Sequence, residues 1–382
     1  MIKKIVEKEL GYLAKYVYQK FRPYVVGVTG SSGKTTTKYF IGELLKSVED
    51  DVLVAPGNMN TETGLPLAVI GFKKGPKGIL EWAKTIIFAP FKAFFTFKYP
   101  KYLVLEYAAD KPGDIEYLTK IIPPDIAVIT NIGVAHLEAF GSLAKIICEK
   151  WYLALRAKQK VIISREALNM AKNLEKPQAE ILSPGEGTVR TANAKNYLNK
   201  TEFDLYILGK KYHSKFQYLG KHNLENLELA VLAVFEIVGE RDKIVERIPY
   251  LLPQEGRGKR IIGRRDILII DESYNANPLS MLAALDVFSK IKYGRKVAIL
   301  GEMKEIGKIS EKSHQEIAKV ASKIADFTIG VGEGFKTAEL DKWYPNVGEL
   351  EGQIESLLQP NDVVLIKGSR ANHLEKIVSK II

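Results

Sequence analysis

Hydrophobic positions along the chain follow two alternating spacings. Short apolar runs, typical of buried strands, are each followed by a polar turn and then by apolar positions three or four residues apart, typical of helices. In the first half of the chain the apolar runs lie at residues 24–26, 102–105, 126–130 and 160–164. Strands that alternate with helices form a parallel sheet covered on both faces. The pattern therefore predicts an α/β fold.

A break near residue 254 divides the pattern. The segment IPYLLPQEGRGKR combines two prolines and two glycines with four charged residues. Beyond it, four more apolar runs each end in a polar loop, as in a doubly wound domain. We therefore expect a central domain over residues 23–253, with a mostly parallel sheet, and a smaller Rossmann-like domain over residues 254–382. The segments FDLYILG and KFQYLG, between residues 165 and 220, predict antiparallel strands.

Two segments carry amphipathic or mixed patterns of another kind. Residues 1–22 predict an N-terminal helix that docks on the central domain, with a membrane surface as the alternative. Its apolar face comprises Ile2, Ile5, Val6, Leu10, Leu13, Val17 and Phe21. Residues 72–101 interleave aromatic residues and lysines around Pro90. We interpret these residues as an insertion in the central domain. Their pattern favours a lid, a partner-docking helix pair or an interfacial element over a surface that stacks nucleic-acid bases.

Composition narrows the class of protein. The chain has 382 residues, 46% of them hydrophobic, and a formal net charge of +11. Without zinc-finger spacing or an arginine run, this charge indicates anionic ligands such as nucleotides more than nucleic acid. The single cysteine, Cys148, excludes an internal disulfide, and its helical surroundings predict a small buried side chain. No signal peptide or spanning segment is evident, so we expect a cytoplasmic protein.

The segment YVVGVTGSSGKTTTK, residues 24–38, predicts a nucleotide site. An apolar strand enters a turn rich in glycine and serine, and a helical pattern follows. Backbone N–H groups of such a loop converge on phosphate oxygens. Lys34 would reach the β- and γ-phosphates of ATP, and Thr35 would ligate Mg²⁺. The strict P-loop pattern is not met, because Val28 stands where it has its first glycine. The expected phosphate contacts come from Gly30, Ser31, Ser32, Gly33, Lys34, Thr35 and Thr36.

Other polar residues lie just past the ends of predicted strands. Thr35, Glu106 and His136 follow three separate strands, and such positions gather at one edge of a parallel sheet. We expect them to ligate Mg²⁺ or to support its ligands. By itself, Lys150 is interpreted as a solvated helix lysine. Arg257 is equally consistent with a phosphate contact and with a solvated loop.

The chain also resembles the Mur ligase family. The resemblance runs in order over residues 24–382. It rests on TGSSGKTTT, NMNTETGLPLAVI, the strand-end Glu106, ITNIGVAHLEAFGS, GKHNLEN, EGR, DESYNANPLSM and LGEM…H…KGSR. It implies a P-loop ATPase domain followed by a Rossmann-like ligase domain. The activity implied is ATP-dependent formation of an amide bond through an acyl phosphate, joining D-Ala-D-Ala to a muropeptide precursor in cell-wall synthesis.

The resemblance assigns roles residue by residue. Lys34, His136, Lys150 and Arg257 would be catalytic, and Lys150 would be carboxylated by CO₂. Two Mg²⁺ ions would be held by Thr35, Glu106, His136 and the carboxylated Lys150. Further nucleotide contacts would come from Asn223, Asn226, Arg257, Asp271 and Asn275. The amine substrate would be held by Lys367, Ser369 and Arg370.

The sequence departs from the family at its start. About 23 residues precede the loop, where the family has a domain that grips the UDP-sugar. Two alternatives to the muropeptide ligase therefore stay open. One is a related ligase with another acceptor, of folate-polyglutamylating type or lipid-linked. The other is a nucleotide-dependent binding subunit that contacts a membrane or a partner protein through residues 1–21 and 72–101.

Overall fold

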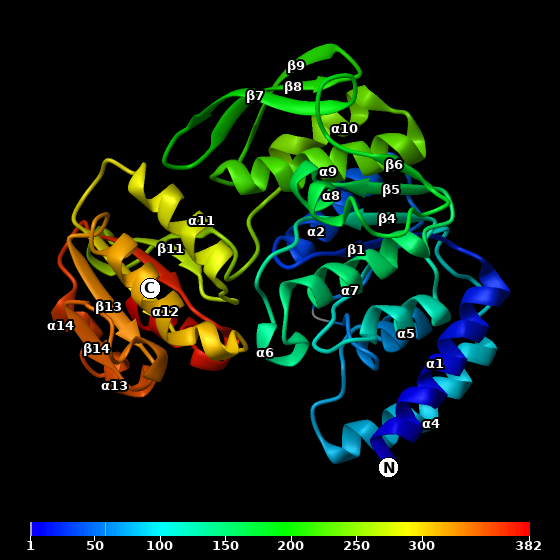
Figure 1. Cartoon of the computed structure of the whole chain (residues 1–382), viewed down its shortest axis with the longest axis horizontal. Helices are drawn as coiled ribbons and strands as arrows, with labels where there is room; N and C mark the ends of the chain where they lie inside the picture. The colour runs from blue at the N-terminus through cyan, green and yellow to red at the C-terminus, as the bar shows by residue number, and fades with distance from the viewer. Residues whose placement is uncertain (1, 58) are drawn as a thin grey trace.

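A six-stranded parallel sheet forms the centre of the larger domain. The computed structural model describes residues 2–57 and 59–382, with side chains from residue 4 (Figure 1). The strands lie in the order β2-β3-β1-β4-β5-β6, and every neighbouring pair is parallel. Their bounds are β1 (Tyr24–Thr29), β2 (Val52–Val54), β3 (Tyr102–Glu106), β4 (Ile126–Ile129), β5 (Lys160–Ile163) and β6 (Glu180–Leu182). This confirms the predicted α/β class and brings the carboxyl ends of β1, β3 and β4 to one edge.

Helices cover both faces of this sheet, because successive strand residues point to opposite sides. Val25 and Leu103 pack into one apolar layer, and Val26 and Val104 into the other. The first layer contains α1 (Ile2–Phe21), α3 (Gly64–Ile70), α4 (Ile79–Phe95), α5 (Asp114–Ile121), α6 (Leu137–Phe140), α7 (Leu143–Leu155) and α8 (Arg165–Ala171). The second contains α2 (Lys34–Lys46), α9 (Lys221–Val238), α10 (Arg241–Arg247) and the short η1 (Ile248–Tyr250).

A three-stranded antiparallel sheet packs on the second layer. Its strands are β7 (Val189–Asn196), β8 (Thr201–Ile207) and β9 (Lys210–Phe216). The segment FDLYILG lies largely in β8, as predicted. Of the segment KFQYLG, only the first two residues belong to a strand, because they are the last two residues of β9. Leu208 and Gly209 both have positive φ and turn the chain in two residues, so β9 starts earlier, at Lys210.

The C-terminal domain is a second layered α/β unit (Figure 1). Its sheet has the order β10-β11-β15-β12-β13-β14, with only β10 antiparallel. The strands are β10 (Lys259–Ile262), β11 (Leu268–Glu272), β12 (Lys296–Gly301), β13 (Phe327–Val331), β14 (Lys342–Tyr344) and β15 (Val363–Lys367). The helices are α11 (Pro278–Ser289) and α12 (Ser310–Ala321) on one face, and α13 (Val347–Glu351), α14 (Ile354–Leu357) and α15 (Glu375–Ile381) on the other. Short 3₁₀ turns are η2 (Arg264–Asp266), η3 (Gly307–Ile309), η4 (Glu333–Phe335) and η5 (Arg370–Asn372).

The two unusual segments of the sequence lie together. Helix α1 docks on the central domain through buried Leu10, Leu13 and Val17, as expected, but Ile5 is exposed, because the first turns of the helix extend beyond the domain. The side chain of Ile2 lies outside the described residues. Residues 72–101 contain one helix, α4, which continues through Pro90 and packs beside α1 instead of forming a helix pair of its own (Figure 1).

Candidate active site

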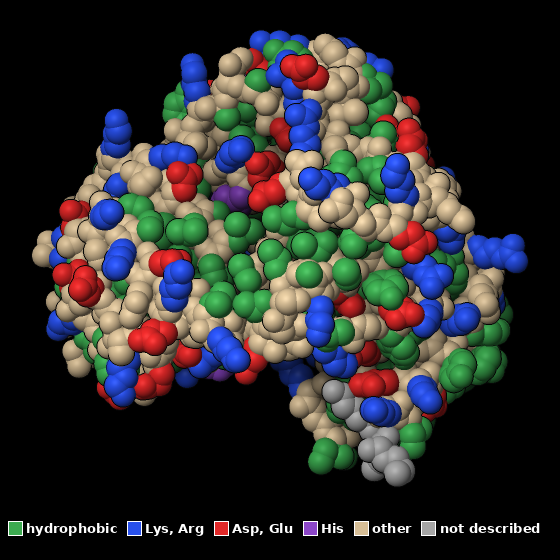
Figure 2. Space-filling model, viewed as in Figure 1, with side chains coloured by type: hydrophobic (Ala, Val, Ile, Leu, Met, Phe, Trp, Pro, Cys, Tyr) green, Lys and Arg blue, Asp and Glu red, His purple; other side chains and the backbone are tan. Residues whose placement is uncertain are grey.

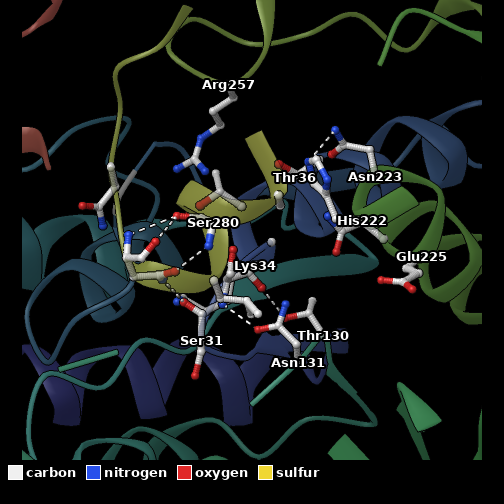
Figure 3. A pocket seen from close by; sticks show the side chains of 18 of the residues that line it. Ser31, Lys34, Thr36, Thr130, Asn131, His222, Asn223, Glu225, Arg257 and Ser280 are labelled. Atoms are coloured by element: carbon white, nitrogen blue, oxygen red, sulfur yellow. Dashed lines mark hydrogen bonds between the residues drawn. The ribbon is translucent and has the colours of Figure 1, made fainter. Parts of the chain in front are cut away.

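A cleft of about 970 Å³ opens at the carboxyl ends of the central strands. The loop after β1 and the ends of β3 and β4 line one side, which we call the central wall. Residues that follow β11 and the end of β15 line the other side, which we call the C-terminal wall (Figure 3). Such crevices beyond the carboxyl ends of parallel strands are the usual ligand sites of α/β proteins. None of the described residues of 72–101 lines this cleft, so that segment is no lid over it.

The loop between β1 and α2 needs glycine at two positions. Gly33 has φ +78°, and a Cβ there would lie 2.5 Å from Asn226 Oδ1. Gly30 has φ +148°, and its Cβ would collide with the hydroxyl of Thr130. The turn after β4 fixes the loop from the side: Asn131 O accepts from Ser31 N at 2.9 Å, and Asn131 Oδ1 accepts from Ser32 N at 2.8 Å. Val28, the missing glycine of the strict pattern, is simply a buried residue of β1.

The amino end of α2 faces the cleft. Gly33 gives the helix no side-chain cap, and the first N–H groups of a helix lack partners within it. With the positive end of the helix dipole, they make an anion site. Lys34 Nζ donates to Gly30 O at 2.9 Å, which places the ammonium group over the loop (Figure 3). Burial lowers the pKa of Lys34, while the charge of Glu106 opposes this shift.

A buried carboxylate lies beside this anion site. Glu106 ends β3; its Oε2 accepts from Thr35 Oγ1 at 2.9 Å and its Oε1 accepts from Asn60 Nδ2 at 2.8 Å. The buried Lys38 Nζ lies 3.4 Å from Oε2. Burial raises the pKa of Glu106, but the charges of Lys38 and Lys34 outweigh it, so the pKa is lowered and the group is ionised. The structure thus brings together two of the predicted metal ligands, Thr35 and Glu106.

His136, the third predicted ligand, lines the cleft but contacts the other domain. It has a left-handed backbone, with φ 55°, and precedes α6. Its Nδ1 lies 2.7 Å from Glu305 Oε2, in the loop after β12, and 3.9 Å from Asp110 Oδ1. The hydrogen bond from His136 lowers the pKa of Glu305. This contact joins the two walls of the cleft.

Lys150 is buried in α7, which overturns its interpretation as a solvated lysine. Among the described residues, no side chain or carbonyl accepts a hydrogen bond from its ammonium group. Burial, together with the charge of Lys34, lowers its pKa to about 7. The next residue, Glu149, accepts hydrogen bonds from Gly113 N and Ile115 N, both at 2.7 Å. A lysine with this pKa is an uncharged amine in a substantial fraction of molecules near neutral pH.

The first turns of α9 line another part of the cleft. Asn223 and Asn226 project from the first turns of α9, and Asn226 packs against Gly33. Asn223 Nδ2 donates to Leu219 O at 2.8 Å and lies 3.0 Å from His222 Nε2 (Figure 3). Burial lowers the pKa of His222, so its ring is neutral at pH 7.

On the C-terminal wall, Arg257 points into the cleft (Figure 3). Its guanidinium lies 4.0 Å from the centre of the Tyr274 ring. Asp271 does not line the cleft: its buried carboxylate accepts from Gly256 N at 2.9 Å and from Ser273 Oγ at 2.6 Å, which orders the segment that carries Arg257. Asn275 lines the cleft directly.

The three residues expected to hold the amine differ in burial and in position relative to the cleft. The buried Lys367 ends β15, donates to Asn275 O at 3.0 Å and lies 3.4 Å from Glu272 Oε2. Ser369 is also buried and accepts from Lys304 N at 2.9 Å. Arg370 is exposed and lies near Glu375 instead of lining the cleft.

Lys38 and Glu305 are among the residues of the site that sequence reasoning missed. Lys38 lies four residues after Lys34 on α2, a spacing that places both ammonium groups on one side of the helix and could have identified it. Glu305 had no local signal, because its role depends on how the two domains meet.

A phosphate-binding loop beside a buried carboxylate, facing a second α/β domain across a cleft, is typical of a two-domain enzyme that uses a nucleoside triphosphate. The Mur ligase middle domain matches residues 28–234, and the Mur ligase glutamate ligase domain matches residues 256–370. The chain therefore belongs to the Mur ligase family.

Its relatives match over almost the whole chain. It is similar to the UDP-N-acetylmuramoyl-tripeptide--D-alanyl-D-alanine ligase of Bacillus subtilis, with 30% identity over 98% of this chain and 79% of that protein. The enzyme of the same name from Haemophilus influenzae is 29% identical over 97% of this chain and 79% of that protein. The crystal structure of MurF ligase from Thermotoga maritima in complex with ADP has a TM-score of 0.82 and 28% identity, covering 98% of this chain and 83% of that one.

Proposed function

We propose that this ligase joins D-Ala-D-Ala to a UDP-MurNAc-tripeptide or a close muropeptide relative, at the expense of ATP. The observation that carries the proposal is that ligases named for this reaction are 28–30% identical to this chain along 97–98% of its length. The cleft supports the proposal as well. On one side, the uncapped amino end of α2 can bind phosphate, and the second domain lies on the other side.

The residues present fit Mg²⁺ at the phosphates of ATP. This ion prefers octahedral oxygen sites with one or two carboxylates and the phosphates of a substrate. Thr35 and Glu106 would hold it, since their oxygens already lie 2.9 Å apart. In the described chain no cluster of three His, Cys, Asp or Glu side chains could hold an ion by itself. When bound, Mg²⁺ would offset charge on the transferred phosphoryl group.

We further propose that Lys150 is carboxylated. Its uncharged amine would add to the carbon of CO₂ and lose a proton, which gives a carbamate anion. The buried position and the pKa of about 7 support this reaction, because only the uncharged amine is a nucleophile. The carbamate and His136 would then contribute to a second Mg²⁺ site.

The chain's own residues suggest the course of the reaction. The acceptor carboxylate attacks the γ-phosphorus of ATP in line, while Lys34 and the α2 N–H groups stabilise the phosphates. The products of this step are an acyl phosphate and ADP. The amine, positioned near Lys367, then adds to the acyl carbon, and the tetrahedral intermediate expels phosphate. Arg257 and Asn275 would close over the nucleotide and exclude water.

The test is phosphate release with Mg-ATP, UDP-MurNAc-tripeptide and D-Ala-D-Ala, omitting each in turn. Release that needs all three, with a product whose mass is the sum of the two substrates less water, supports the proposal. Phosphate release that depends on neither UDP-MurNAc-tripeptide nor D-Ala-D-Ala would be compatible with the ligase class but would mean that the acceptor is another molecule.

Outside the cleft, we propose that residues 1–21 and 72–101 form a contact surface. The side chains it exposes favour a membrane over a partner protein, as argued below.

A further inference from the structure

Helix α4 buries its small side chains and exposes its large apolar ones. Thr85, Ala89 and Ala93 are buried on the side that packs against α1 and α3. On the other side Leu80 is 80% exposed, Ile87 71% and Phe91 60%. A surface helix of a water-soluble domain normally shows the reverse arrangement. No described residue covers this face, so its apolar side chains face the solvent.

Helix α1 extends the same surface. Its exposed side includes Tyr12 and Tyr16, and the Tyr16 ring lies 4.9 Å from that of Phe94. Lys20 Nζ ties the end of α1 to α4 by donating to Phe94 O at 3.1 Å and to Thr96 O at 2.9 Å. The two helices lie side by side at one end of the molecule (Figure 1). We call the exposed sides of these helices, with Phe97 at their end, the α1–α4 surface.

The two segments that contain this surface carry most of the net charge of the chain. Residues 1–21 and 72–101 contain twelve lysines and three glutamates, so they hold +9 of the chain's formal net charge of +11. None of the described acidic side chains forms an ion pair with Lys8, Lys15, Lys84 or Lys98. Hydrophobic and basic side chains lie interspersed at this end of the molecule (Figure 2).

We propose that the α1–α4 surface binds the headgroup region of an anionic phospholipid bilayer, with α1 and α4 lying in the plane of the interface. Exposed aromatic and aliphatic side chains would enter the acyl boundary, while the surrounding lysines contact lipid phosphates. A second copy of this chain fits less well, because two surfaces of the same strong positive charge repel each other. No helix among the described residues is long and apolar enough to span a bilayer, so attachment would be from one side only.

Binding in this way would hold the cleft at a fixed orientation to the membrane. Helix α3 packs against both α1 and α4, and Tyr99 OH donates to Val69 O at 2.7 Å. The chain just before α3 carries Asn60, which contacts Glu106 in the cleft. The surface and the active site are therefore parts of one rigid domain. The proposal does not depend on the identity of the ligase substrates.

Vesicle flotation of the full chain tests the proposal. We expect it to float with phosphatidylcholine vesicles that contain phosphatidylglycerol, to stay behind with phosphatidylcholine alone, and to bind less in high salt. The double variant Ile87→Ser/Phe91→Ser should lower the partition coefficient by about 100-fold, since each buried apolar side chain contributes about tenfold. The matched control, Tyr250→Ser/Ile262→Ser, removes two equally exposed apolar side chains from elsewhere and should bind as the wild type does.

Three outcomes would overturn the proposal. The first is that the wild type does not float with the anionic vesicles. The second is that the Ile87→Ser/Phe91→Ser variant floats as well as the wild type does. The third is that the wild type binds no lipid but self-associates in sedimentation analysis, and that this variant abolishes the self-association. The last would assign the surface to a second copy. Phosphate release by each variant in lipid-free solution shows whether it is folded and active, so that a failure to bind vesicles is separated from a failure of the ligase.

Discussion

The two walls of the cleft are held in place differently. In the central wall, Glu106 contacts Thr35, Asn60 and Lys38, all from its own domain and largely out of solvent. In the C-terminal wall, the half-buried side chain of Arg257 rests on the ring of Tyr274, while the backbone beside it is held by the carboxylate of Asp271. A site fixed by buried contacts keeps its geometry when the other domain moves. The central wall is therefore preorganised for phosphate, whereas we expect the ligand contact of Arg257 to depend on how the two domains close.

The strongest test of this comparison is Lys34→Met in the central wall. The substitution keeps the length of the side chain but removes the charge that, under the proposed function, would stabilise the transferred phosphoryl group, so we expect kcat/KM for ATP to fall by about 10³-fold. Phosphate release under single-turnover conditions measures it. Lys46→Met, at the exposed end of the same helix, is the matched control. Near-normal turnover by Lys34→Met would remove the basis for a preorganised phosphate site.

Lys150 lies behind the same wall, and Lys150→Ala should lower activity by about 100-fold whether or not bicarbonate is added. Wild-type activity should instead rise with bicarbonate in buffer depleted of CO₂. The control is Lys145→Ala, which removes an exposed lysine from the same helix. Full activity of Lys150→Ala would exclude a catalytic carbamate.

Lys150 also gives a prediction about stability and pH. Its pKa is about 7 in the folded chain and 10.5 ordinarily. Between these values the unfolded chain binds a proton that the folded chain does not, so the free energy of unfolding should rise with pH from 7 to 10.5, by at most about 1.4 kcal/mol per unit. Below pH 7 the contribution is constant. Lys150→Met should lose this slope in denaturant unfolding without CO₂. Equal slopes for the two proteins would mean that the lysine is solvated.

The C-terminal wall should tolerate substitution better. Under the proposed function, Arg257→Ala would remove a charge-assisted contact to phosphate made on domain closure, and we expect kcat/KM for ATP to fall by about 10- to 100-fold. The melting temperature should change little. Arg241→Ala is a matched control, because that arginine also lies over an aromatic ring, Phe235, but outside the cleft. A loss as large as that of Lys34→Met would place Arg257 in the preorganised part of the site.

The same difference explains what the sequence could predict. Thr35, Glu106 and His136 were found because strand ends meet at one edge of a parallel sheet, which follows from topology alone. The class of both domains followed from the spacing of apolar residues. The apolar residues 65–70 lie in the helix α3.

Features set by tertiary packing could not be predicted in this way. Cys148 was expected to be buried but is exposed, because the buried side of α7 is the one that carries Glu149 and Lys150. Asp271 supports the segment around Arg257 instead of facing the nucleotide. Glu305, with φ 68°, reaches His136 only because the loop after β12 meets α6 of the other domain.

The smallest predicted effect concerns that contact between the walls. Glu305→Gln keeps the shape of the side chain but removes the charge that faces His136 Nδ1 at 2.7 Å. Because both side chains are partly exposed, we expect only a two- to fivefold rise in the KM for ATP, as for other solvent-accessible pairs worth about 0.2–1 kcal/mol. A double-mutant cycle with His136→Gln measures the coupling separately from any role of His136 at a metal. A coupling near zero would mean that closure is set by the nucleotide alone. A measurable coupling would mean that the domains are already biased towards the closed arrangement before ATP binds.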